Sequence, residues 1–151
     1  MFGGKYIMNN KEFLKSIYEV VNMGYHSCNK LLEDLEGKDN KIISMIEAMK
    51  RKYCSFQKDT KKLDKKYKTE LEDLGFMAKM GSSMEMKMEV MKDNSDSKIA
   101  DMLIRGNTMG VVEIEKGIHK YEEKADKGVL KLAKEVLIFQ KENIETLKEY
   151  L

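Results

Sequence analysis

The 151-residue chain contains no proline and no tryptophan, and it has only two cysteines and two histidines. Because proline kinks or ends helices, its absence favours long ones. The two cysteines, Cys28 and Cys54, are too few for a disulfide framework or a zinc site. Counted from the expected turn between the first two helices, they lie at different heights, so we expect no disulfide between them.

The chain also lacks a long apolar run and an excess of one charge. No apolar segment approaches the ~18 residues of a membrane span, and residues 1–10 have no apolar stretch typical of a signal peptide. With 28 basic and 26 acidic residues, the net charge is +2, so no overall field attracts nucleic acid or an anionic membrane. We therefore expect a cytoplasmic protein that binds neither membranes nor nucleic acid.

The chain does have 42% hydrophobic residues, many of them at helical spacing, together with 36% charged residues. Clusters of turn-forming residues at short intervals are missing, which argues against a β-sandwich. Four segments instead repeat apolar residues every three or four positions, as amphipathic helices do. The predicted helices cover residues 10–36, 40–74, 97–124 and 127–150.

The ends of the first helix carry recognisable signals. Asn9, with Glu12 three residues later, is predicted to cap its start, and Gly37 is predicted to end it. Because only a short turn follows Gly37, the first two helices should lie antiparallel.

Three glycines inside the third helix, Gly106, Gly110 and Gly117, are a further signal. Each costs ~1 kcal/mol relative to alanine in a helix interior, so we expect a neighbouring helix or a large side chain to approach closely there. The third and fourth helices should form a second hairpin that turns near Ala125. That turn places Gly110 opposite Gln140.

Residues 75–96 differ from the rest because nearly half of the 13 methionines lie there. Met84, Met88 and Met91 would share one face of a helix, so we expect a short helix within a connection. A connection of about 20 residues is long enough to run back along a bundle, whereas a tight hairpin needs only a few.

Two antiparallel helices, a long crossover after Leu74-Gly75 and a second helical hairpin make up the predicted layout. The more specific features are Ile104-Arg105-Gly106-Asn107, Ile118 to Tyr121, Leu132-Ala133, Gln140, and Ile144 to Leu151. Together they resemble the ferritin-like four-helix bundles, in particular small bacterial ferritin-like domains of unassigned function. The resemblance implies an all-α, ferritin-like up-down four-helix bundle over residues 1–151, with the long crossover between its second and third helices.

A ferritin-type di-iron centre needs a Glu from each of two helices and Glu-x-x-His from each of the other two, all facing inward. Neither histidine fits, since Met23 stands three residues before His26 and Lys116 three before His119. The chain departs from the metal-binding branch at the ligands, so we expect no di-iron centre and no cofactor. Glu115 and His119 share a helix face and are candidates for a different metal.

The methionines supply a second metal candidate. Met84, Met86 and Met88 offer thioethers to a soft ion such as Cu(I). Methionine more often fills a core or forms a soft contact surface, so packing or a dimer contact is the other interpretation.

Polar residues within the predicted core are a stronger functional signal. Asn107 and Gln140 lie in the inward stripes of the third and fourth helices, and Asn143, expected opposite Asn107, lies on the flank. Since buried amides need hydrogen-bond partners, either they close a structural network or they line a small-ligand or water-filled pocket. The residues that can extend this network from the first hairpin are Tyr18, Tyr53, Thr60 and Tyr67.

The second predicted helix is rich in lysine on its outward face. Its candidates for binding a polyanion are Lys58, Lys61, Lys62, Lys65 and Lys66. A solvated helix surface is the alternative, and no aromatic residues alternate with these lysines to stack on bases.

The sequence therefore predicts a structural or partner-binding bundle that associates with itself or with another protein. We expect a binding protein more than an enzyme. A metal-binding bundle and a polyanion-binding surface are the two alternatives.

Overall fold

The computed structural model describes residues 2–68, 71 and 86–151, with side chains described from residue 9 onward. The described part is helical throughout, apart from turns and short connections, and contains no strand. The long helices are α1 (Phe2–Asp34), α2 (Ile43–Tyr67), α4 (Asp96–Tyr121) and α5 (Lys127–Leu147), and a 3₁₀ turn η1 (Lys148–Tyr150) follows α5. In addition, residues 86–92 are helical.

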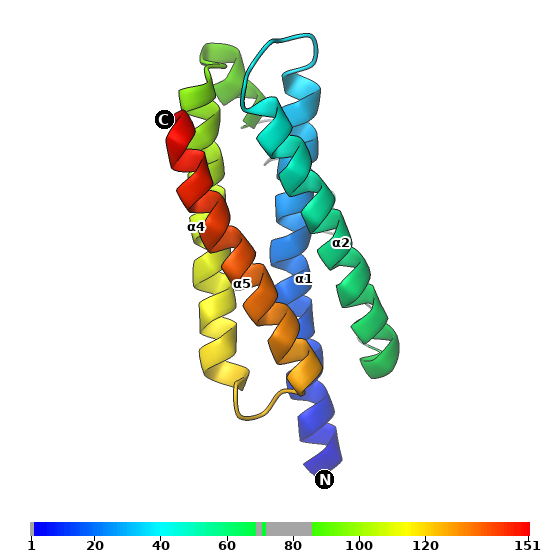
Figure 1. Ribbon diagram of the computed structural model, residues 1–151. Helices are drawn as coiled ribbons and strands as arrows, with labels where there is room; N and C mark the ends of the chain where they lie inside the picture. Colours follow the sequence, from blue (N-terminus) through cyan, green and yellow to red (C-terminus); the bar gives the residue numbers. More distant parts are fainter. Residues whose placement is uncertain (1, 69–70, 72–85) are drawn as a thin grey trace.

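The four long helices pack as two antiparallel pairs (Figure 1). The first pair is α1 with α2, and the second is α4 with α5. Because α2 and α4 run in the same direction, the chain between Tyr67 and Asp96 connects opposite ends of the bundle. The predicted all-α bundle of paired helices is thus confirmed.

The predicted start of the first helix is wrong. α1 begins at Phe2, and Asn9 is inside it, so Asn9 and Glu12 do not form a capping box. Asn10 Oδ1 instead accepts a hydrogen bond from the backbone N–H of Asp126 at 2.7 Å. Glu12 Oε2 accepts one from the hydroxyl of Tyr121 at 2.9 Å. These polar side chains bind the second hairpin, which lets the helix continue past them.

The predicted end of the second helix, at residue 74, is also wrong. α2 ends at Tyr67 because Lys68 adopts the left-handed conformation, with φ 53° and ψ 48°. The N–H of Lys68 bonds to the carbonyl of Asp64, which closes the last turn. Residues 69, 70 and 72–74 of the predicted helix lie outside the described residues.

The start of α2 is capped by a side chain from α4. Ile42, the N-cap residue, makes no side-chain capping bond of its own. Asp96 Oδ2 accepts from the N–H of Lys41 at 3.2 Å, and Asp96 Oδ1 accepts from the N–H of Ile42 at 3.4 Å. Asn40 Nδ2 donates to Asp96 Oδ1 at 3.0 Å. The tertiary capping explains why the helix begins at Ile43 and not at residue 40.

The second hairpin follows the prediction closely. Ser95 caps α4 by accepting a hydrogen bond from the N–H of Lys98. Asp126 is the N-cap residue of α5. Two predicted ends are wrong by one turn. α4 ends at Tyr121 and not at residue 124, because the N–H groups of Lys124 and Ala125 both bond to the Tyr121 carbonyl in a turn, and residues 148–150 are 3₁₀ and not α-helical.

The predicted short helix in the methionine-rich connection is present at residues 86–92. Val90 is buried, whereas Met88 and Met91 are exposed. Met84 lies outside the described residues, so the face that it was predicted to share with them is not described.

No helix in the described ranges is long and apolar enough to cross a membrane. Both cysteines are free thiols, Cys28 buried and Cys54 partly exposed.

Candidate ligand pocket between α1 and α4

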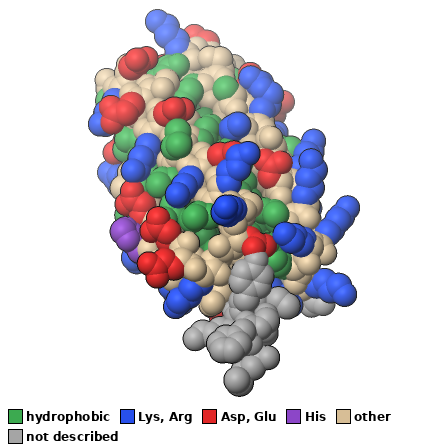
Figure 2. Space-filling view, turned by 60° about the horizontal axis from the view of Figure 1, so that its bottom comes forward, with side chains coloured by type: hydrophobic (Ala, Val, Ile, Leu, Met, Phe, Trp, Pro, Cys, Tyr) green, Lys and Arg blue, Asp and Glu red, His purple; other side chains and the backbone are tan. Residues whose placement is uncertain are grey.

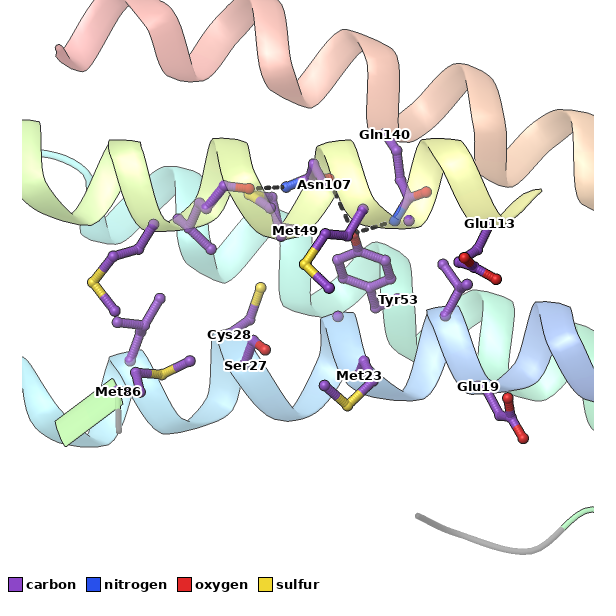
Figure 3. A pocket seen from close by; sticks show the side chains of 18 of the residues that line it. Glu19, Met23, Ser27, Cys28, Met49, Tyr53, Met86, Asn107, Glu113 and Gln140 are labelled. Carbon is purple, nitrogen blue, oxygen red and sulfur yellow. Dashed lines mark hydrogen bonds between the residues drawn. The ribbon is translucent and has the colours of Figure 1, made fainter. Parts of the chain in front are cut away.

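A network of hydrogen bonds crosses the centre of the bundle and joins three helices (Figure 3). Tyr53 on α2 donates from its hydroxyl to Asn107 Oδ1 on α4 at 3.1 Å. Gln140 Nε2 on α5 donates to the Tyr53 hydroxyl oxygen at 3.2 Å. Asn143 Nδ2 donates to Asn107 Oδ1 at 3.2 Å, and Asn107 Nδ2 donates to the Leu103 carbonyl at 2.8 Å.

One acceptor in this network is left without a donor. The Leu103 carbonyl can only accept, so Asn107 turns its Nδ2 toward it and its Oδ1 toward Tyr53. The Tyr53 hydroxyl donates its only hydrogen to that Oδ1 and accepts a hydrogen bond from Gln140 Nε2. Gln140 Oε1 then has no hydrogen-bond partner in the described structure, although Gln140 is only 2% exposed. An unmet buried acceptor of this kind costs ~1–3 kcal/mol.

Two glycines make room for the network. A Cβ on Gly24 of α1 would lie 2.7 Å from Tyr53 Cε2, and one on Gly110 of α4 would lie 2.8 Å from Gln140 Cδ. Such contacts are too close for any larger residue. The Tyr53 ring and the Gln140 amide can therefore sit flat against the helix backbones.

A pocket of about 390 Å³ opens beside the network, between α1 and α4. Its uncharged polar lining comprises Tyr53, Asn107 and Gln140 of the network together with Ser16 and Ser27 of α1. A Cβ at Gly106 would meet nothing within 4 Å, so the expectation of a close neighbour holds at Gly110 and Gly117 but not at Gly106, which faces open space. The methionines that line the pocket are Met23, Met49, Met86, Met102 and Met109.

The charged residues of the lining are all acidic. Of the described residues that line the pocket, Glu19 and Glu113 are charged, and none is Lys, Arg or His. Both glutamates are exposed at the rim. Glu113 Oε1 also lies 3.6 Å from Lys116 Nζ, which is exposed to solvent.

The pocket wall also contains a thiol that is chemically quiet. Burial raises the pKa of Cys28 to about 12, even though the positive charge of Lys50 acts in the opposite direction. Burial likewise raises the pKa of the Tyr53 hydroxyl. Both groups are therefore protonated near neutral pH, and Cys28 is not an activated nucleophile.

The remaining predicted members of the network are Tyr18, Thr60 and Tyr67. Thr60 donates its hydroxyl to the Gln57 carbonyl of its own helix at 2.7 Å. Tyr18 is buried on α1, and the Tyr67 hydroxyl is buried with no hydrogen-bond partner among the described residues. None of the three belongs to the described pocket lining.

The two predicted sets of metal ligands lie in different places, and Glu115 and His119 line the same surface pocket on α4. Glu115 Oε1 pairs with Lys141 Nζ at 2.9 Å, and His119 is exposed on the same surface of α4. Met86 lines the pocket whereas Met88 is 58% exposed, as their spacing of two residues on a helix requires. The described residues contain no group of three or more His, Cys, Asp or Glu that could hold a metal ion.

The predicted polyanion-binding lysines are all exposed on α2. Figure 2 shows Lys and Arg side chains along the right-hand edge of the molecule, the side on which α2 lies in Figure 1. Lys66 is engaged with Asp126 on α5, at 3.3 Å. This lysine surface consists of Lys58, Lys61, Lys62, Lys65 and Lys66.

The sequence pointed to the polar residues Tyr53, Asn107 and Gln140 but not to the glycines and methionines that line the pocket around them. Gly24 and Gly106, together with Met23 and Met109 beside the mouth, line it from α1 and α4. Comparison of the chain with protein family models, with curated proteins and with solved structures finds no match in any of the three.

Proposed function

We propose that the protein binds a small, largely apolar molecule in the pocket between α1 and α4. The observation that carries the proposal is Gln140 Oε1, a buried acceptor without a donor in the wall of a 390 Å³ pocket. Pockets for small molecules typically have such a volume, an apolar lining and a few well-placed polar groups. A ligand that donates a hydrogen bond would satisfy the acceptor.

The methionines support a binding role. Five of them line the pocket, and methionine side chains adapt to ligands of different shape. A bound apolar molecule would remove the methionine surface of the pocket from water and so stabilise the folded chain.

The lining favours binding over catalysis. The Cys28 thiol is held protonated by burial, and no histidine lines the described part of the pocket to act as a general base. The residues that remain can hold and orient a molecule but do not form a nucleophile and base pair.

The ferritin-like topology inferred from the sequence is part of this proposal. It is supported by the order of the two hairpins and by a connection that joins opposite ends of the bundle. A ferritin-type metal site would require inward carboxylates and histidines, and the centre of this bundle holds Tyr53, Asn107 and Gln140. We therefore propose an organic ligand in place of a di-iron centre.

The experiment that tests this function fills the pocket by a single substitution. In Gly106→Leu, the new Cβ would meet nothing within 4 Å. Since Gly106 lines the pocket, we expect the leucine side chain to occupy part of it, and leucine is the better helix former. We expect the apolar dye Nile red to bind the wild-type protein saturably, with one site per chain, and the variant about tenfold more weakly or not at all. Fluorescence titration measures both affinities.

Gly128→Leu is the matched control. Gly128 is exposed near the start of α5 and does not belong to the described lining. Its Cβ would make only an ordinary contact, 3.7 Å from Leu63 Cδ2. Equal dye binding by the wild-type protein and Gly106→Leu would refute the proposed function.

A second candidate function is contact with an acidic partner through the lysine surface of α2. The observation that favours it is the exposure of all five lysines on one helix, of which Lys66 has a carboxylate partner within reach in Asp126. The partner can be a second protein or another polyanion.

A further inference from the structure

We infer that the pocket selects apolar molecules that carry a protonated amine. This inference rests on the proposed function and adds the charge and the hydrogen-bonding character of the ligand. It follows from three observations: the hydrogen-bond acceptor that the network leaves without a partner, the sign of the charges in the lining, and the positions of this acceptor and these charges in the pocket.

The first observation is that the network leaves one buried acceptor, Gln140 Oε1, with no hydrogen-bond partner among the described residues. The direction of every bond follows from the Leu103 carbonyl, through Asn107 and Tyr53, to Gln140 Nε2. Gln140 Oε1 is what remains. A ligand group that donates a hydrogen bond meets this need, whereas a carboxylate or ketone would face oxygen with oxygen.

The second observation is the sign of the charge. The chain as a whole is slightly basic, with 28 basic and 26 acidic residues. The described lining nevertheless contains Glu19 and Glu113 and no basic side chain. Two cations lie near the lining: Lys50, whose charge acts on Cys28 in the wall, and Lys116, which lies 3.6 Å from Glu113 and is 71% exposed at its side chain. An exposed pair of this kind is weak and is easily replaced by a bound ammonium group.

The third observation is that the acceptor and the acids lie on the same part of the pocket. The Gln140 amide packs against Gly110, and Glu113 follows Gly110 by three residues, about one turn or 5 Å along α4. In Figure 3, Glu19 and Glu113 lie at one end of the pocket and Met86 lies at the other. An elongated ligand can thus place its apolar body among the methionines and its ammonium group near the glutamates.

Three probes that share one scaffold separate the contributions: 4-phenylbutylammonium, 4-phenylbutanol and 4-phenylbutanoate. We expect the ammonium compound to bind about five- to tenfold more tightly than the alcohol, because two exposed carboxylates each add a screened attraction. We expect the carboxylate compound to bind more weakly than the alcohol. Isothermal titration calorimetry on the full chain at pH 7 measures all three.

The double variant Glu19→Gln/Glu113→Gln keeps the shape of the rim and removes its charge. We expect the preference for the ammonium over the alcohol to fall to within about twofold, with little change in the affinity for the alcohol. The double variant Glu47→Gln/Glu142→Gln removes the same charge from exposed sites on α2 and α5 outside the described lining, and should keep the preference.

The outcomes distinguish the two proposals. If the alcohol binds and the ammonium compound gains nothing, or if the preference survives in Glu19→Gln/Glu113→Gln, the inference is wrong and the proposed function stands. Tightest binding by 4-phenylbutanoate also overturns the inference. If none of the probes binds, or if Gly106→Leu binds them as the wild type does, the proposed function fails as well.

Discussion

At the scale of single residues, the pocket region is notable for groups that are kept neutral. Burial raises the pKa of Cys28 from its ordinary value of 9.0 to about 12. In the unfolded chain the thiol would ionise at its ordinary value. The folded protein therefore holds a proton that the unfolded chain releases as the pH rises above about 9.

This difference predicts a loss of stability at alkaline pH. The contribution of Cys28 is fully present below pH 9 and is lost as the pH rises from 9 toward 12. While the thiol titrates only in the unfolded state, the loss approaches about 1.4 kcal/mol per pH unit. We expect Cys28→Ala to be less stable at neutral pH but to show a flatter decline between pH 9 and 10. Urea unfolding across that range measures the slope, and identical slopes in the two proteins would contradict the prediction.

At the scale of helices, Asp96 joins the two hairpins. Asp96 is the first residue of α4, and its carboxylate accepts hydrogen bonds from the Asn40 side chain and from the backbone N–H of Ile42. A carboxylate near the start of a helix also interacts favourably with the helix dipole. One side chain therefore stabilises the first turns of both α2 and α4.

We expect Asp96→Ala to cost about 1–2 kcal/mol of stability, as the loss of a capping carboxylate does. The amide protons of residues 41–45 should exchange faster with solvent, because α2 loses its capping partner. Asp101→Ala is the matched control, since Asp101 pairs with the exposed Arg105 one turn away on α4, and such a pair is worth less than ~1 kcal/mol. Chemical denaturation and hydrogen exchange measure the two variants. Equal costs would show that Asp96 acts only as a surface charge.

The sequence predicted the helices well and their ends less well. Amphipathic spacing defines a helix because it reflects the face that must be buried, and all four long helices were found. The ends at Asn9 and residue 74 were wrong for different reasons. Near Asn9 the polar side chains bind another hairpin, and at Lys68 a non-glycine residue adopts the left-handed conformation. Neither event leaves a local signal in the sequence.

The candidate site was predictable only in part. The contact of Gly110 with Gln140 and that of Asn107 with Asn143 follow from a hairpin whose short turn sets the register of α4 and α5. The pocket between α1 and α4 could not be predicted in this way. These helices are not consecutive, so no short turn relates Gly24 to Gly106, and their spacing depends on the packing of the whole bundle.

At the scale of the whole molecule, charge is distributed unevenly although the total is close to zero. The net charge of +2 conceals the lysine surface on α2 and the acidic rim between α1 and α4. Exposed groups of this kind act mainly through long-range attraction, which salt screens over about 10 Å at 0.1 M. The second candidate function is therefore best tested by position of charge at a constant total.

We expect the quadruple variant with Lys58, Lys61, Lys62 and Lys65 changed to Glu to elute from a heparin column at lower salt than the wild type. The control changes Lys15, Lys87, Lys124 and Lys134 to Glu, four exposed lysines spread over other parts of the surface. Both variants have the same net charge, so only a localised binding surface separates them. Elution of the two at the same salt concentration would reject the lysine surface as a specific site.

The central network has a consequence for how the protein responds to acidity. Amide groups do not titrate in the physiological range, and the Tyr53 hydroxyl, whose pKa burial raises, keeps its proton there. The Tyr53–Asn107–Gln140 network thus presents the same donors and acceptors to a ligand from mildly acidic to mildly alkaline conditions. The network itself therefore adds no pH dependence to ligand binding in that range. A bundle with carboxylates and histidines at its centre would not behave in this way.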